Sequence, residues 1–343
     1  MNNKELFTNF YNDLYKNILD EYFLEIDKYI KQNKSKTTIL GILLTIIPIV
    51  LLWYLFFQIK KYILIFLLAT IIYIILIKIF IKIRYKDNNK QIIKQIKYKI
   101  LDDFITLISG NDESKVVPNN RISKDSFQKA MLFNLDNVLY TGANYIQTTI
   151  EDKALVLADM NIYTLIDKTK EEYFYVGGRK FKRTYQTKKK KDIFKGIYLG
   201  SETLRKNNNL VQIIPNTLKD NLVNNKINKY YDLCSYELKL ENLEFSKKYS
   251  VYSNNEIKAR MVLTLTMMEQ INKLDDIIKN KKYIIFKNDD RYSIFIENMT
   301  FDEILDNNIS IERKPEKELN NLYNIYTEIS KLFELALIIN NSK

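Results

Sequence analysis

The feature that most constrains this chain is an uncharged apolar run from Ile39 to Phe57, ILGILLTIIPIVLLWYLFF. As a helix rising about 1.5 Å per residue, it would cover roughly 28 Å, close to the hydrocarbon thickness of a bilayer. A second apolar run, YILIFLLATIIYIILIKIFIKI, extends from Tyr62 to Ile83 after a short link. The two runs predict a transmembrane hairpin with spans at about 39–57 and 62–83.

Two other interpretations of the first run are less consistent with the sequence. A secretory signal peptide is excluded because the run begins about forty residues into the chain and lacks a small-residue cleavage site. A buried helical hairpin in a soluble protein remains an alternative. Two such runs back to back, both flanked by basic residues, favour the membrane.

Basic residues on both sides of the hairpin predict its orientation. Four precede the first span: Lys28, Lys31, Lys34 and Lys36. Six end or follow the second: Lys78, Lys82, Arg84, Lys86, Lys90 and Lys94. Lys60 and Lys61 in the connecting turn oppose this trend mildly. The excess of bases at the outer ends predicts a two-span protein of the cell membrane with both termini cytoplasmic.

The chain divides by pattern into three parts. Residues 1–36 form an amphipathic helix with an aromatic stripe at three- and four-residue steps. The stripe lies either in the membrane interface or against the soluble domain, and the mixed charge of the polar face favours packing. Residues 37–86 carry the transmembrane hairpin. Residues 87–343 form a cytoplasmic domain.

Periodicity in the cytoplasmic part predicts an α+β fold, an antiparallel sheet with packed helices. Alternating and β-branched segments punctuated by glycines predict a sheet over residues 138–214, with further strands at 249–252, 282–286 and 292–296. Helical spacing predicts helices at 88–108, 125–133, 255–278 and 316–339. The first of these would continue the second span.

A central segment carries a family resemblance. Residues 240–274 contain a Leu-Glu-x-x-x-Phe helix, a strand ending in Val-Tyr, and a helix with Ala-Arg and Leu-Thr-x-x-Met-Met. These are Leu240, Glu241, Phe245, Val251, Tyr252, Ala259, Arg260, Leu263, Thr264, Met267 and Met268. The segment resembles the bacterial family catalogued as domain of unknown function 3137. Tyr140, Gly142 and Tyr145, with Asn144 where an acid is more usual, and the segment 193–200 extend the resemblance. It implies a membrane-anchored protein and adds no reaction.

The composition narrows the possible chemistry. Histidine is absent, which removes the commonest general base and metal ligand, so Ser-His-Asp triads and Cys-His dyads cannot form within this chain. The single cysteine, Cys234, cannot form an intramolecular disulfide, and its apolar surroundings favour a buried core thiol. No phosphate-binding glycine motif occurs, and no cofactor is predicted.

The sharpest local feature is a cluster of eight bases within residues 179–191 that contains no acid. Its members are Arg179, Lys180, Lys182, Arg183, Lys188, Lys189, Lys190 and Lys191, with Phe181 and Tyr185 between them. We expect a solvent-exposed hairpin tip. A lysine-rich composition favours bases that are simply solvated, and a contact to anionic lipid headgroups is the second interpretation. A contact to nucleic-acid phosphates is the third. The formal net charge of +12 does not decide among them, because the chain is rich in lysine throughout.

Two further groups of polar residues have candidate roles. Arg260 either pairs with Glu256 on a helix surface or lies buried against Glu241 or Glu244. Ile257, Met261, Leu265, Met268 and Ile271 are expected to face the core beside it. Asp289 and Asp290 with Asp302 and Glu303 offer paired carboxylates, although Asn-Asp-Asp-Arg between two strands is first of all a turn.

Together these observations predict a membrane-tethered binding or scaffold module that has no assigned catalytic residues. Its expected partners are the lipid bilayer, anionic headgroups or a cytoplasmic protein, and nucleic acid is not favoured. A membrane-associated enzyme of unrecognised type is the alternative. An enzyme would gather several titratable groups in one concave pocket, whereas a binding module would present a surface patch.

Overall fold

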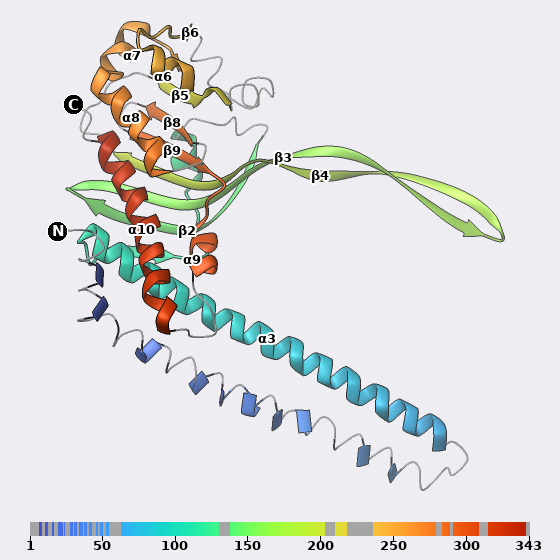
Figure 1. Ribbon diagram of the computed structural model, residues 1–343. Helices are drawn as coiled ribbons and strands as arrows, with labels where there is room; N and C mark the ends of the chain where they lie inside the picture. The colour runs from blue at the N-terminus through green and yellow to red at the C-terminus, as the bar shows by residue number, and fades with distance from the viewer. Residues whose placement is uncertain are drawn as a thin grey trace. The chain divides into compact units, whose positions relative to one another are not determined.

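The fold is shown in a computed structural model of the chain (Figure 1). The structure describes residues 63–129, 138–202, 210–217, 236–278, 283–288, 291–308 and 315–340, together with isolated residues between 7 and 54. The chain forms two compact units, residues 1–100 with 311–323 and residues 101–310 with 324–343. The predicted boundaries at residues 36 and 86 stay predictions.

One antiparallel sheet organises the larger unit. Its described strands are β1 (Lys115–Val117), β2 (Leu139–Ile150), β3 (Lys153–Val176), β4 (Arg179–Glu202), β5 (Val211–Pro215), β6 (Tyr236–Glu237), β7 (Tyr249–Ser253), β8 (Tyr283–Asn288) and β9 (Arg291–Glu297). They follow the order β1-β2-β3-β4-β9-β8-β5-β7-β6. The predicted α+β fold with an antiparallel sheet is therefore confirmed.

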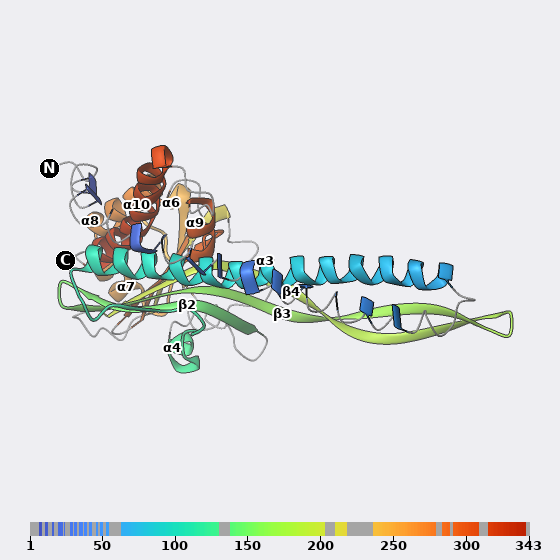
Figure 2. The ribbon, with the colours of Figure 1, turned by 90° about the horizontal axis from the view of Figure 1, so that it is seen from below.

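The sheet is covered on both faces. In Figure 2, helices α8 (Leu265–Ile277) and α9 (Phe301–Asn308) lie on one face with the end of α10 (Pro315–Asn340), and α4 (Lys124–Lys129) lies on the other. The core on the α4 face contains Ile122, Phe127, Val138, Ala158, Met160, Ile162, Phe194, Tyr198, Ile214, Tyr252, Ile284 and Phe295. Because strand side chains alternate, the intervening residues of β3, such as Leu157, point to the helices.

Three more helices complete the described part of the chain: α3 (Ile63–Ser109), α6 (Leu243–Lys248) and α7 (Glu256–Val262). The end of α3 belongs to the larger unit, where Phe104 is fully buried and contacts the ring of Tyr326 at 6.1 Å between centroids. The predicted continuity of a helix from the second apolar run to residue 108 is confirmed by α3.

One predicted helix is divided. Residues 255–278 form α7 and α8, separated by Leu263 and Thr264. The Thr264 side chain accepts a hydrogen bond from the backbone N–H of Met267 and caps α8. Threonine favours this position because its hydroxyl satisfies a free N–H at the helix start. The break therefore follows from a local capping signal, and sequence reasoning also missed α9.

The smaller unit shows part of the N-terminal aromatic stripe. Phe7 is 1% exposed, and its ring lies 5.5 Å from that of Tyr323. Tyr11 is also buried, whereas Leu24 and Tyr29 are exposed. The first residues of the stripe thus pack within the smaller unit, and packing of the whole stripe stays a prediction. Most of the predicted helix over residues 1–36 lies outside the described residues.

Among the residues that the structure describes, no helix combines enough length with enough apolar character to cross a membrane. The first predicted span, residues 39–57, lies largely outside the described residues. The second, residues 62–83, falls in α3 from residue 63 onward. Many side chains of that segment are not among those that the structure describes.

Candidate functional site

A two-stranded ribbon leaves the sheet. Strand β2 pairs with β3 only as far as Tyr163, and β9 pairs with β4 only from Gly196 onward. Pairing between β3 and β4 nevertheless continues to Val176 and Arg179. The outer parts of β3 and β4 therefore form a projecting ribbon, residues 164–191, visible in Figures 1 and 2.

The ribbon ends in a two-residue turn at Gly177 and Gly178. Their φ angles of 57° and 79° are positive, which glycine adopts at little cost. Positive φ at both central residues is the geometry of a type I′ turn, whose twist matches that of the flanking strands. The glycine pair thus explains why β3 and β4 remain in register up to the tip.

Both faces of the ribbon are exposed. Every residue from Leu165 to Gln186 is exposed, including its apolar side chains. These are Leu165, Ile166, Tyr173, Phe174, Tyr175, Val176, Phe181 and Tyr185, with exposed fractions between 38% and 70%. An isolated hairpin is only marginally stable in water. A long ribbon with exposed aromatic residues is thus a candidate contact surface.

The strand register sorts the eight predicted bases into two equal sets. Side chains alternate along β4, and residues directly opposite on β3 share a face. The arginine face carries Arg179, Arg183, Lys189 and Lys191, opposite Val176, Glu172, Ile166 and Thr164. The lysine face carries Lys180, Lys182, Lys188 and Lys190, opposite Tyr175, Tyr173, Asp167 and Leu165.

Three of the four bases of the lysine face contact neighbouring side chains of β3 and β4. Lys182 forms an ion pair with Glu171 at 2.6 Å, which lowers the pKa of Glu171 and raises that of Lys182. Lys180 lies 4.3 Å from the ring centroid of Tyr173. Lys190 contacts Asp192 at 3.3 Å and the Tyr163 ring at 4.1 Å. These contacts occupy much of the lysine face.

The arginine face differs from the lysine face in the ion pairs of its bases and in its aromatic residues. Among the described residues, none of its four bases forms an ion pair with an acid. At its centre, Phe174 and Phe181 are directly opposite and stack, with ring centroids 5.7 Å apart and planes 19° apart. This face therefore combines an exposed aromatic pair with basic side chains that form no ion pair with a described acid.

The prediction for this segment is refined in one respect. The bases were expected at a solvent-exposed hairpin tip, and the hairpin is present and exposed. All eight lie on strand β4, however, and only Arg179 and Lys180 adjoin the turn. A regular strand presents the bases in two ordered rows, which a loop would not do.

A buried carboxyl that sequence reasoning missed lies within the sheet. Asp159 on β3 is 8% exposed. Its Oδ1 accepts the backbone N–H of Phe301, the first residue of α9, at 2.9 Å. Its Oδ2 accepts a hydrogen bond from Asn144 Nδ2 at 2.6 Å. The only sequence signal is an acid within the apolar run ALVLADM.

A bulge in β2 brings Asn144 to this carboxyl. The register shifts between Ala143 and Ile146, and Asn144 has a φ of 54°, which asparagine tolerates better than most residues. Asn144 is fully buried, and its Oδ1 has no hydrogen-bond partner among the residues that the structure describes. Burial raises the pKa of Asp159 to about 7, and the nearby Asp302 adds to this against the opposing hydrogen bonds.

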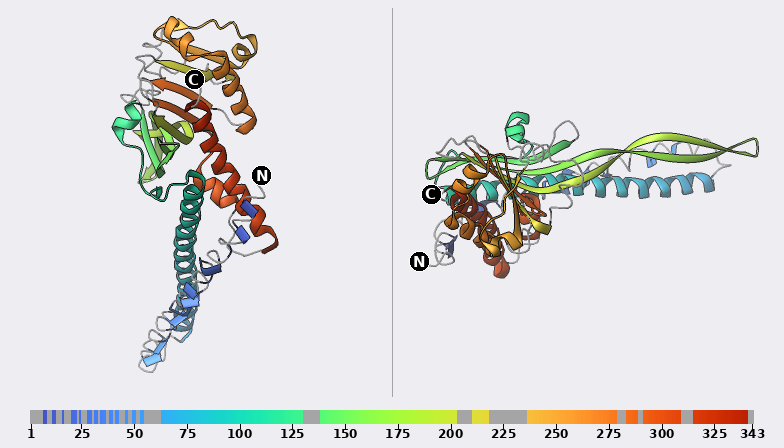
Figure 3. Two further views of the ribbon diagram at one scale, coloured as in Figure 1. Left: turned by 90° about the vertical axis from the view of Figure 1, so that its left-hand side faces the viewer. Right: turned by 90° about the horizontal axis from the view of Figure 1, so that it is seen from above.

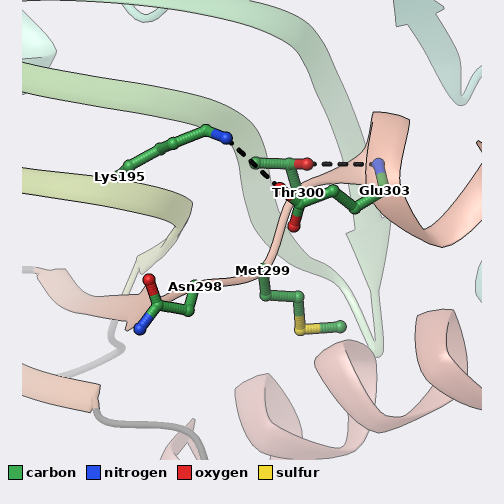
Figure 4. A pocket seen from close by; sticks show the side chains of 5 residues that line it. All are labelled: Lys195, Asn298, Met299, Thr300 and Glu303. Atoms are coloured by element: carbon green, nitrogen blue, oxygen red, sulfur yellow. Dashed lines mark hydrogen bonds and ion pairs between the residues drawn. The ribbon is translucent and has the colours of Figure 1, made fainter.

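A small polar pocket lies next to this cluster along the chain (Figure 4). Its volume is about 120 Å³, and Lys195, Asn298, Met299, Thr300 and Glu303 line it. Lys195 Nζ lies 3.2 Å from Glu303 Oε1, so its two charged groups face each other. Ligand pockets usually measure about 300–1,000 Å³. This pocket has room for a few water molecules or a very small ligand.

Two of the four carboxylates that the sequence grouped together are among the described residues. Asp302 and Glu303 begin α9, where Glu303 N–H donates to Thr300 Oγ1 at 3.1 Å. Asp289 and Asp290 lie outside the described residues, as does Cys234. Within the part of the chain that the structure describes, no three Asp, Glu or Cys side chains gather as a metal site.

Arg260 lies on the helix surface. It donates to Glu256 Oε1 from Nε and from a terminal nitrogen, at 3.2 and 3.0 Å, and to the Lys239 carbonyl at 2.9 Å. The surface pairing is thus confirmed, and the buried alternative with Glu241 or Glu244 is wrong.

The apolar positions expected to face the core beside Arg260 are only partly buried. Ile257, Met261 and Leu265 are exposed, whereas Met268 and Ile271 are buried. The break between α7 and α8 interrupts the apolar stripe, and α7 buries Ala259 and Val262 instead. The predicted core face is therefore wrong for α7 and the start of α8, and right for the rest of α8.

We expect Arg260→Ala to lower the free energy of unfolding by less than about 1 kcal/mol, because exposed ion pairs contribute little. Urea unfolding of the variant beside Glu256→Gln, which removes the same pair from the other side, measures this. A loss of about 3 kcal/mol or more, as for a broken buried pair, would contradict the surface assignment.

The C-terminal part of this chain is similar to a known protein family. Residues 192–340 match the family described as "Protein of unknown function (DUF3137)". This region of the chain is therefore similar to a DUF3137 domain, and the match covers less than half of the chain. The matched region includes the predicted motif residues 240–268 and the segment 193–200. It begins at Asp192, so Asn144, the predicted spans and the eight bases all lie outside it.

Other comparisons add little to the DUF3137 assignment. No curated protein sequence matches this chain. One solved structure, the crystal structure of the mycobacterial trehalose monomycolate transport factor A, TtfA, is similar with a TM-score of 0.33 at 11% identity. The similarity covers 68% of this chain and 95% of that one. A likeness this distant carries no functional inference.

Proposed function

We propose that this chain is a membrane-tethered binding module whose projecting ribbon contacts anionic phospholipid headgroups. The observation that carries the proposal is the ribbon itself, residues 164–191, which leaves the sheet with both faces exposed. A sheet does not need this extension for its own core. Exposed bases and aromatic side chains on a narrow projection are suited to a surface outside the domain.

The sequence supports a tether in the same chain. The uncharged run 39–57 and the apolar run 62–83 each have the length of a span, and bases flank the pair on its outer sides. On α3, Ile71, Ile72, Ile75, Leu76 and Ile79 are all about half exposed. Lipid would cover such a stripe. We accordingly propose a two-span location in the cell membrane with both termini cytoplasmic.

A tether changes the energetics of a weak surface contact. Each base near an anionic leaflet contributes about 1 kcal/mol, and a tethered ribbon meets that leaflet at high effective concentration. A modest number of contacts is then sufficient to hold the domain against the bilayer. A cytoplasmic protein that docks on the ribbon is the other partner that this geometry allows.

The test uses the full-length chain held in discs of neutral phosphatidylcholine, mixed with separate vesicles that contain or lack phosphatidylserine. We expect the chain to incorporate into the discs and to float with the anionic vesicles only, with binding lost at high salt because charge screening weakens it. Changing all eight bases to Gln should reduce the bound fraction at least about tenfold without affecting disc incorporation.

The membrane tether and the ribbon contact are tested separately. A chain that stays outside the discs overturns the tether. Incorporated chain that ignores anionic vesicles, or an eight-base variant that binds them as well as the parent does, overturns the ribbon contact. Circular dichroism of the variant verifies that the sheet has formed.

A further inference from the structure

We propose that only one face of the distal ribbon, the arginine face near the tip, contacts the anionic phospholipid, and that the lysine face points away from the bilayer. The contact consists of Arg179, Phe181 and Arg183 on β4 with Phe174 and Val176 on β3. This inference rests on the proposed function and adds which side chains recognise the headgroups.

The first reason is that the two faces differ in the availability of their charges. Beside the turn, Lys182 pairs with Glu171 at 2.6 Å, and Lys180 lies over the Tyr173 ring. Within the described residues, Arg179 and Arg183 form no such pair. A guanidinium presents a fork of donors that matches the oxygens of a phosphate. The free arginines are therefore better placed to bind phosphodiester groups.

The second reason is the apolar content between the arginines. Phe181 lies two residues from each arginine, at about 7 Å along the strand. It stacks on Phe174, and Val176 beside them is 59% exposed. Arginine and aromatic side chains at the membrane interface can place their apolar parts among the lipids while the cations remain at the headgroups. The face thus has both components that an interfacial contact needs.

The same pair argues for lipid over nucleic acid. Proteins that bind single strands stack successive bases on open aromatic rings. Here the two rings lie against each other, 19° from parallel, so one face of each is already covered. Val176 offers no ring at all. Insertion into a membrane interface needs only the edges of the two stacked rings and the side chain of Val176.

Only the distal part is assigned because ribbons twist. Two-stranded ribbons rotate strongly along their length, and Figure 3 shows this ribbon turning between the sheet and the tip. Lys189 and Lys191 share the arginine face by alternation but lie nearer the sheet. A flat bilayer can meet the face over a short stretch only. Residues 174–183 form that stretch.

The interleaved bases provide a matched pair of variants. Arg179→Gln with Arg183→Gln removes two cations from the arginine face, and Lys180→Gln with Lys182→Gln removes two from the lysine face of the same strand. In the disc and vesicle assay, we expect the arginine double variant to lose about tenfold or more of its binding to phosphatidylserine vesicles. The lysine double variant should lose less than about twofold.

A second measurement leaves these charges in place. With Cys234→Ser as background, Val176→Cys and Tyr175→Cys place a polarity-sensitive fluorophore on opposite faces at the tip. Anionic vesicles should shift the emission of the probe at position 176 to the blue. The probe at position 175 should shift little.

The outcomes separate this inference from the proposed function. Equal losses in the two double variants, or equal shifts of the two probes, overturn the face assignment and leave the ribbon contact standing. Parent protein that does not bind phosphatidylserine vesicles overturns both. Binding to a single-stranded oligonucleotide that exceeds binding to vesicles, and that the arginine variant loses, would assign this face to nucleic acid and overturn the lipid assignment.

Discussion

Gly196→Ala is expected to lower the free energy of unfolding by at least about 3 kcal/mol, the upper range for overpacked cores. A Cβ at this position would lie 1.8 Å from the carbonyl oxygen of Ile296 and 2.9 Å from the ring of Phe194. Gly196 is the first residue of β4 to pair with β9. The obstructing atom belongs to the backbone of that strand, so relief requires the two strands to separate where the ribbon leaves the sheet.

Urea unfolding followed by circular dichroism measures this effect. Gly177→Asn is the matched control, because a Cβ there meets nothing within 4 Å and asparagine tolerates the positive φ of 57°. It should change stability by less than about 1 kcal/mol. If the alanine variant unfolded at the same urea concentration as the parent, the close approach of β4 and β9 at this point would be wrong.

Asp159→Asn is expected to remove a pH dependence of stability. The carboxyl has an ordinary pKa of 3.8 and a pKa of about 7 in the folded protein, chiefly because it is buried. The folded chain therefore binds this proton more tightly than the unfolded chain does. Its stabilising effect is full below about pH 4 and is lost as the pH rises to about 7, a change of up to about 4 kcal/mol.

Unfolding of parent and variant by urea at about pH 5 and about pH 8 gives the difference in stability at each pH. The parent should weaken relative to Asp159→Asn as the pH rises. Asp159→Leu separates titration from hydrogen bonding, since it leaves the Phe301 N–H and Asn144 Nδ2 buried without this acceptor. It should lose about 2–4 kcal/mol at both pH values. A difference between parent and Asn variant that does not change with pH would contradict the raised pKa.

Local pattern predicted much of the fold. Alternation across residues 138–214 indicated the sheet, and the helical spacing of residues 316–339 indicated α10, because these signals reside in neighbouring residues. The insertion of β9 between β4 and β8 was not predictable in this way. That order depends on pairing between Gly196–Glu202 and Arg291–Glu297, which are remote in sequence.

The basic residues of the candidate site were predicted from the sequence, but their arrangement on two faces of a ribbon was not. The eight bases were evident, but placing them all at a hairpin tip concealed that strand alternation divides them into two faces. A strand assignment for residues 179–191 would have given the same division from sequence alone. The Asp159 cluster needed more, since Asp159, the bulge at Asn144 and the start of α9 lie at three separate places in the chain.

The sheet order also has a consequence during synthesis. Strands β2, β3 and β4 can pair as soon as residue 202 has emerged, because they follow one another directly in the chain. The edge of β4 that receives β9 stays unpaired until residues 203–297 have been made, on the order of ten seconds at ordinary translation rates. During that interval an apolar edge is open to pairing with other nascent chains. This protein is consequently expected to depend on chaperones while residues 203–297 are being synthesised.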